Sequence, residues 1–443
     1  MFMELPNDMF NEIFGYLSQA ELVNFLLVNR KMYEKTMKYI EDKVYKNYHH
    51  SYMTRSYAKN NLIISIRHIE SKMCADDYMY GLFGACSANN LDLVKYFMRI
   101  GNLRYTGKNK YKYEWRSAFE EACKNGNIKI ILEFIQCNFE DWNCGYLAAC
   151  RSGQLDIIDY MIRMGATRLE DGLEDGLGSA CHHGQLDVVK KLLTKYNISA
   201  SDFQSAFYGG HMNVIKYIHD NCNLFMDNYR WNGCLQYACK GAGNIDCINF
   251  AISNGANDWK ESLSLACYSG KFDAAQMMLG KYLDKGVYNT EFLYKCVSSL
   301  CGFGSDKILE LILKTIQEID GCVNQKILIE GFNRACSACR FDVVKFLIPN
   351  YLNDLNNDFY INGLKILLRK ELEKRSDVLV GYNDDVCALL LSKINFDSCG
   401  VEILNDIFST ACENKNTFVM RFIKNKGAIK CGNCKKTMKK HIN

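Results

Sequence analysis

A helical hairpin recurs along most of this chain, and this repeat limits the possible fold more than any other feature. In its clearest copy, residues 146–166, apolar side chains follow one face of a short helix as far as Cys150. A turn follows at Gly153, and a second amphipathic helix begins at Leu155. One hairpin of this size cannot bury its own apolar face, so neighbouring copies must stack on one another.

Ten copies share one register, marked by an alanine or its equivalent followed by Cys or Phe. These register residues are Ala85, Ala122, Ala149, Ala180, Ala206, Ala238, Ala266, Lys295, Ala335 and Ala411. A weaker copy is expected between the last two. The mean step is about 33 residues, within the range that indicates stacked repeats.

The second half of each copy resembles an ankyrin repeat. Residues 184–193 (Gly-Gln-Leu-Asp-Val-Val-Lys-Lys-Leu-Leu) and 153–166 carry the resemblance, and Ala-Cys stands where that family usually has Ala-Ala. The family's Thr-Pro-Leu-His opening is missing, since the only prolines are Pro6 and Pro349, but an apolar residue stands three positions before each register residue. The resemblance implies an all-α protein: an ankyrin-repeat α-solenoid of about ten to eleven helix-turn-helix repeats.

Residues 1–45 do not follow the repeat and predict a small domain of three helices, with a capping box at residues 18–21 before the second. This segment resembles an F-box, which docks onto a Skp-family adaptor of cullin-RING ubiquitin ligases. By that resemblance the residues that meet the adaptor would be Leu5, Pro6, Ile13, Phe14, Leu17, Leu22 and Val28. The family's usual tryptophan is absent, with Met32 and Tyr33 near its place. In the alternative interpretation the three helices only cap the solenoid.

The sequence divides into four parts. After the F-box-like domain, residues 46–77 are expected to form a helical connector or a degenerate repeat, residues 78–430 the ankyrin repeats, and residues 431–443 a basic tail. The net charge of +4 is uneven, because the eight Lys and Arg of residues 421–443 face no acidic residue there. The rest of the chain is mildly acidic, so a protein that coats nucleic acid is not expected.

The chain is expected to be soluble, intracellular and cytoplasmic. Its N-terminus lacks the basic and apolar regions of a signal peptide, and no segment approaches the ~18 apolar residues of a membrane span. The tail lysines 435, 436, 439 and 440 leave nuclear localisation open. Nine of the 22 cysteines directly follow a register residue, where a small buried side chain fits, and this predicts free thiols rather than disulfides.

Two periodic or variable features bear on recognition. The four tryptophans, Trp115, Trp142, Trp231 and Trp259, stand seven residues before a register residue, which favours an aromatic ladder between repeats over partner contact. The insertion at residues 101–114 is expected to project as a loop that carries Arg104, Tyr105, Lys108, Lys110, Tyr111, Lys112 and Tyr113. This mixture suits an acidic partner peptide, or phosphates and stacked bases, although a solvated loop without a ligand fits equally well. Residues 221–230 form a second variable tip.

Catalytic signatures are missing from the sequence, which predicts a protein that is not an enzyme and has no cofactor. There is no phosphate-binding Gly-rich loop and no His-Glu-x-x-His, and His182, His183 and His211 fall in repeat turns. The pairs Cys336/Cys339 and Cys431/Cys434 should lie at least ~20 Å apart and cannot share a metal ion. Cys431, Cys434 and His441 supply at most three ligands, so no metal site is expected.

These features together indicate a protein–protein interaction adaptor. By resemblance it would be the substrate-recruiting subunit of a Skp/cullin/F-box ubiquitin ligase, with the repeat surface holding an unknown target protein and no membrane partner. One alternative is an ankyrin scaffold or inhibitor that binds a host protein without a ligase. Another is a nucleic-acid binder that uses residues 104–112 and the tail. The F-box, the degenerate Ala-Cys copies and the Asn-, Tyr- and Lys-rich usage also resemble ankyrin-repeat proteins of large DNA viruses.

Overall fold

The computed structural model describes residues 75–100, 112–166, 176–284, 286, 289–303, 305–352, 355–370, 380–414 and 416–428. The predicted F-box-like domain, nearly all of the predicted connector and the basic tail lie outside these residues. The predicted domain boundaries therefore stay predictions, although α6 already begins at Ala75.

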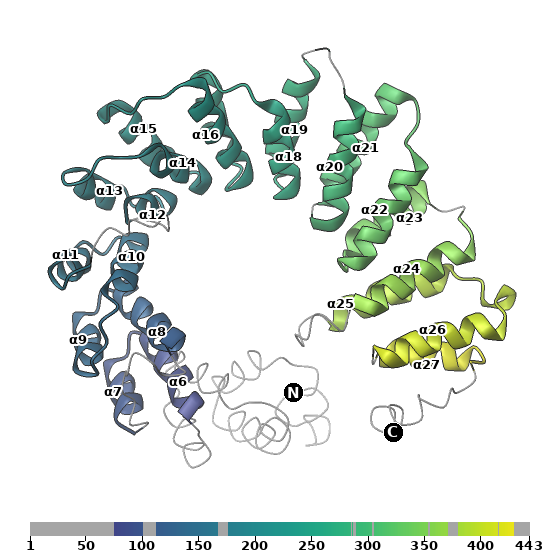
Figure 1. Cartoon of the computed structure of the whole chain (residues 1–443), viewed down its shortest axis with the longest axis horizontal. Coiled ribbons are helices and arrows are strands. Elements are labelled where there is room, and N and C mark those ends of the chain that lie inside the picture. The colour runs from purple at the N-terminus through teal and green to yellow at the C-terminus, as the bar shows by residue number, and fades with distance from the viewer. Residues whose placement is uncertain are drawn as a thin grey trace, which may run out of the picture. The chain divides into compact units, whose positions relative to one another are not determined.

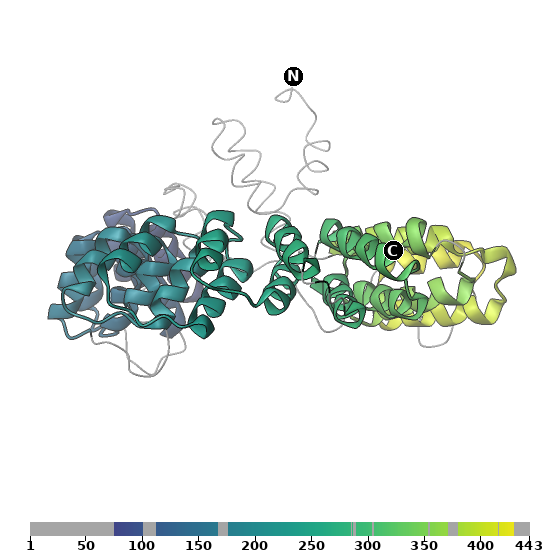
Figure 2. The ribbon, with the colours of Figure 1, turned by 90° about the horizontal axis from the view of Figure 1, so that it is seen from above.

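The described residues form eleven consecutive pairs of α-helices and contain no strand. Figures 1 and 2 show these helices from two directions. This confirms the predicted all-α solenoid of helix-turn-helix repeats. The weak copy expected after Ala335 is present as α24 (Asn357–Lys370) and α25 (Val380–Lys393). The chain divides into two compact units, Met1–Leu224 and Phe225–Asn443.

The first unit contains five of the pairs. Its helices are α6 (Ala75–Ser87), α7 (Leu91–Ile100), α8 (Lys112–Lys124), α9 (Ile128–Gln136), α10 (Trp142–Ser152), α11 (Leu155–Arg163), α12 (Gly176–His182), α13 (Leu186–Leu193), α14 (Ala200–Gly209) and α15 (Met212–Asn221). The first helices of successive pairs pack side by side in one layer, and the second helices line the other layer (Figure 1).

The second unit repeats this two-layer arrangement. Its helices are α16 (Asn228–Lys240), α17 (Ile245–Ser253), α18 (Trp259–Tyr268), α19 (Phe272–Leu283), α20 (Thr290–Phe303), α21 (Asp306–Asp320), α22 (Gln325–Ser337), α23 (Phe341–Tyr351), α24, α25, α26 (Val401–Glu413) and α27 (Thr417–Asn425), with a short 3-10 helix at Phe396–Ser398.

The core lies between the two layers and is built from the periodic positions of the sequence. The alanine register residues and the cysteines that follow them are buried in every described copy, and the described cysteines are free thiols. On the second helices, apolar residues at helical spacing face the same core; in α11 these are Ile157, Ile158 and Met161. The predicted free thiols are therefore confirmed for the described residues, and burial is confirmed for the cysteines that follow the register residues. Other described cysteines are half-buried or exposed: Cys137, Cys222, Cys322, Cys339 and Cys399.

Side chains that reach from one repeat to the preceding turn fix the stacking register in the first unit. The Nε2 of Gln154 donates a hydrogen bond to the carbonyl oxygen of Lys124 (3.1 Å), and the Nε2 of Gln185 donates to that of Arg151 (3.0 Å). Both acceptors lie in the last turn of a first helix, where carbonyl groups lack helical partners. Gln185 also crosses closely over Gly153, whose φ of 82° is left-handed and favours glycine.

The tryptophans are structural, but they do not pack only between repeats. Trp115 is 1% exposed and Trp231 is 5% exposed, while Trp142 and Trp259 are half-buried. Trp142 contacts Phe119 of the preceding pair (6.2 Å between ring centroids), as a ladder requires. Trp115 instead packs on Phe134 of its own pair (5.5 Å). Trp231 likewise packs on Phe250 of its own pair (6.1 Å), so the tryptophans fill space within a pair as well as between pairs.

Candidate interaction surfaces

The buried thiols offer no reactive nucleophile. Burial raises the pKa of Cys239 to about 12 and that of Cys301 to about 12, so both are protonated at neutral pH and react poorly. Within the described part of the chain, no group of three or more His, Cys, Asp or Glu side chains is placed to hold a metal ion. None of the helices described is long and apolar enough to cross a membrane.

The predicted adaptor-binding residues, Leu5 to Val28, all lie outside the described residues. The same holds for the predicted target-binding residues 104, 105, 108, 110 and 111. Lys112 and Tyr113 were expected on the same loop, but they form the first turn of α8. That prediction of a loop was wrong for these two residues because the helix must begin ahead of Trp115 to hold its buried ring in the core. Tyr113 is 77% exposed and points an aromatic side chain into solvent.

The second variable tip presents two exposed aromatic side chains just before and within the first turn of α16. Phe225 is 70% exposed and Tyr229 is 85% exposed. Arg230 holds this tip in one conformation: its Nη1 donates to the carbonyl oxygen of Phe225 (2.6 Å), and its guanidinium carbon lies 5.0 Å from the Phe225 ring centroid. Pre-ordered Tyr, Phe and Arg side chains are frequent in binding hot spots.

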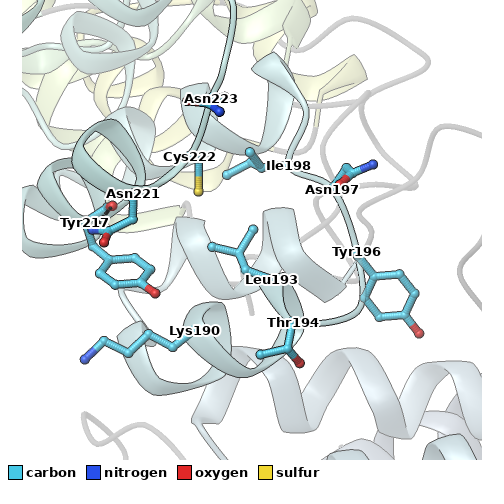
Figure 3. A pocket seen from close by; sticks show the side chains of 10 residues that line it. All are labelled: Lys190, Leu193, Thr194, Tyr196, Asn197, Ile198, Tyr217, Asn221, Cys222 and Asn223. Atoms are coloured by element: carbon cyan, nitrogen blue, oxygen red, sulfur yellow. Dashed lines mark hydrogen bonds between the residues drawn. The ribbon is translucent and has the colours of Figure 1, made fainter.

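A cavity of about 420 Å³ opens between α13, α15 and the segments that follow them (Figure 3). Leu193, Ile198 and Cys222 give it an apolar floor, and Lys190 lies with its Nζ 5.4 Å from the ring centroid of Tyr217. The remaining lining residues are Thr194, Tyr196, Asn197, Asn221 and Asn223. Such a site can hold one apolar side chain of a partner within a polar rim, but it brings together no acid–base or nucleophilic pair.

A third surface lies at the C-terminal ends of α18, α20 and α22, where Tyr268 and Phe303 are exposed beside two arginines. Sequence reasoning missed it, because its residues come from separate repeats and only stacking brings them together. One signal was present in the sequence. Two residues after the register alanine, some copies carry a basic residue such as Lys124 or Arg151, but two copies carry a tyrosine, Tyr208 and Tyr268.

Comparison with known proteins identifies the N-terminal segment. Residues 2–38 match the F-box domain family. No curated protein matches the chain significantly. Among solved structures, the human ASB11 ankyrin repeat domain is 19% identical and aligns with 45% of this chain and 96% of its own, with a TM-score of 0.31. The pentatricopeptide repeat protein PPR10 from maize is 11% identical over 96% of this chain and 66% of its own, with a TM-score of 0.32. Scores this low support no inference about partners.

Proposed function

We propose that this protein is the substrate-recruiting subunit of a Skp/cullin/F-box ubiquitin ligase. The observation that carries the proposal is an F-box match at residues 2–38, followed by two units of helix pairs that stack within each unit. F-box domains typically bind a Skp-family adaptor, and helical repeats typically bind proteins along an extended surface. In this proposal the chain transfers no ubiquitin itself, and the cullin complex supplies that activity.

The proposed division of labour follows from the two kinds of surface. Leu5, Pro6, Ile13, Phe14, Leu17, Leu22 and Val28 would form the apolar face that holds the adaptor. The target would bind the repeats, and the cationic insertion at residues 104–113 is one proposed contact, with Tyr113 already exposed at the start of α8. We place the complex inside the cell, in the cytoplasm. By its resemblance to viral ankyrin-repeat proteins, the target would be a protein of an infected host.

The first test is co-elution of the purified full-length protein with a Skp-family adaptor. An Ile13→Asp, Leu17→Asp double variant places two charges on the apolar face and should abolish co-elution. An Asn11→Asp, Asn24→Asp double variant adds the same charge at two polar positions of the same segment and should leave it unchanged. Circular dichroism of both variants must show the helix content of the wild type.

Two outcomes would favour the alternative functions, a scaffold without a ligase or a nucleic-acid binder. A folded wild type that never co-elutes with the adaptor overturns the ligase proposal and leaves a scaffold or inhibitor that binds its partner without a ligase. Binding to single-stranded nucleic acid that falls steeply with salt would instead support the basic residues of the insertion and tail as a nucleic-acid site.

A further inference from the structure

Two exposed aromatic rings meet at the C-terminal ends of neighbouring helices in the second unit. Tyr268 ends α18 and is 51% exposed, and Phe303 ends α20 and is 62% exposed. Their ring centroids lie 5.5 Å apart. Helices α18, α20 and α22 follow one another in the same layer (Figure 1). Large aromatic side chains that contact each other yet stay half in water are enriched at protein interfaces.

Arg334, on α22, is held against α20, the helix that ends at Phe303. Its Nη1 donates to the carbonyl oxygen of Ser298 (3.0 Å) and to the Oγ of the same serine (2.7 Å). Its stem passes over Gly302, where a Cβ would lie 3.2 Å from its Cδ. It forms no ion pair within the described part of the chain. A guanidinium group has five N–H donors, and Arg334 uses only its Nη1 for Ser298. Its other N–H groups can therefore still donate to a carboxylate.

Basic side chains gather at the C-terminal ends of these helices, whereas the nearest acidic residues along the chain, Asp273 and Asp306, lie in the first turns of the following helices α19 and α21. Arg340 donates its Nη1 to the carbonyl oxygen of Phe303 (3.4 Å), which brings a second guanidinium to the same place. The last turns of α16, α18, α20 and α22 contain no acidic residue, and Lys240 ends α16. Cations at helix C-termini also complement the helix dipole. That effect accounts for a positive charge there, but not for two exposed rings or for an arginine held in place by Ser298.

We propose that the surface formed by Tyr268, Phe303, Arg334 and Arg340 binds an acidic segment of the target protein. In this arrangement an apolar or aromatic side chain of the target packs on Tyr268 and Phe303, and a neighbouring Asp or Glu carboxylate pairs with Arg334. The surface crosses three helices, which at ~8–10 Å per helix is a span of ~20 Å, or about six extended residues. The inference rests on the proposed role of the repeats as the target-binding part.

The test uses a library of random peptides about twelve residues long, twice the span estimated for the surface. Peptides are selected on the full-length wild type alone, and the affinity of each selected peptide for the wild type and for an Arg334→Glu variant is measured by fluorescence anisotropy. We expect acidic sequences with at least one aromatic or large apolar residue. Their affinity should fall about tenfold or more with Arg334→Glu, and similarly with a Tyr268→Ser, Phe303→Ser double variant, as for hot-spot residues.

Matched variants make the result specific. Lys326→Glu reverses a charge on the same helix at its opposite end, where Lys326 is exposed, and should leave peptide affinity unchanged. Arg334→Lys keeps the charge but loses the guanidinium group and should fall between wild type and Arg334→Glu. Selected peptides that are neutral or basic, or that bind Arg334→Glu as well as the wild type, would overturn the proposal. So would a single-stranded oligonucleotide that binds this surface in place of every peptide.

The outcome is separable from that of the ligase proposal. Arg334→Glu lies far along the chain from the F-box and should co-elute with the Skp-family adaptor as the wild type does. Loss of peptide binding with adaptor binding intact supports both proposals. Peptide binding through Arg334 in a protein that never binds the adaptor would overturn the ligase proposal and leave this surface standing.

Discussion

Replacing Gly153 by alanine should destabilise the first unit by ~2–3 kcal/mol, the sum of two costs. Gly153 has a φ of 82°, and a left-handed conformation costs an alanine ~1–2 kcal/mol. The new Cβ would also lie 2.6 Å from the Oε1 of Gln185, so that side chain must move. Its hydrogen bond to the carbonyl oxygen of Arg151 (3.0 Å) is then lost, at ~1 kcal/mol.

Gly270 supplies the control for the backbone cost. It occupies the same turn position with a φ of 68°, but a Cβ there meets nothing within 4 Å. Gly270→Ala should therefore cost only the ~1–2 kcal/mol of the left-handed backbone. Gln185→Ala should cost ~1 kcal/mol, and the Gly153→Ala, Gln185→Ala double variant should cost ~1 kcal/mol less than the sum of the two single variants.

Urea unfolding followed by circular dichroism gives these free energies. Hydrogen exchange measured by mass spectrometry shows whether protection is lost around the turn that was changed, which matters in a repeat protein where neighbouring repeats need not unfold together. A Gly153→Ala variant no less stable than Gly270→Ala would refute the reasoning. So would strictly additive costs for Gly153→Ala and Gln185→Ala, because the two residues would then not be coupled.

Three further predictions follow from packing, charge and burial. Phe119→Ala should cost ~3–5 kcal/mol in urea unfolding, since the ring is fully buried with its centroid 4.7 Å from that of Phe139; a cost below ~1 kcal/mol would contradict the packing. Lys191→Ala breaks a partly exposed ion pair with Asp159 (2.5 Å) and should cost under ~1 kcal/mol in the same assay. Burial raises the pKa of Cys301 from 9.0 to about 12, so its contribution to stability is complete below pH 9 and is lost as the pH rises towards 12, at ~1.4 kcal/mol per pH unit. Cys301→Ala should flatten that alkaline loss of stability measured by urea titration at several pH values, and an unchanged slope would contradict the assignment.

The repeat architecture could be predicted from sequence because its physical causes are local and periodic. The register alanine must be small where first helices pack closely, and the turn four residues later needs a left-handed residue, most often glycine as at Gly153. Those two requirements repeat at a nearly constant spacing, so even degenerate copies reinforce one another. They also placed the weak copy that forms α24 and α25.

The surfaces were less accessible to sequence reasoning. The start of α8 was missed by three residues, because helix ends depend on how Trp115 packs and not only on local composition. Tyr268, Phe303 and Arg334 stand in three separate repeats and show no common motif. These residues lie close together because α18, α20 and α22 stack on one another. The two rings are exposed because no other part of the described structure packs over them. Neither the proximity nor the exposure can be read from one sequence.

Ubiquitin transfer in a reconstituted reaction tests the central claim most directly. The full-length protein is combined with a Skp-family adaptor, a cullin–RING pair, a ubiquitin-activating enzyme, a ubiquitin-conjugating enzyme and ubiquitin, with and without the adaptor. The account predicts adaptor-dependent ubiquitin conjugates on the chain or on a protein bound to its repeats, and their loss in the Ile13→Asp, Leu17→Asp variant. Conjugates that form equally well without the adaptor or in that variant, or no conjugates from a wild type that is folded, would contradict it.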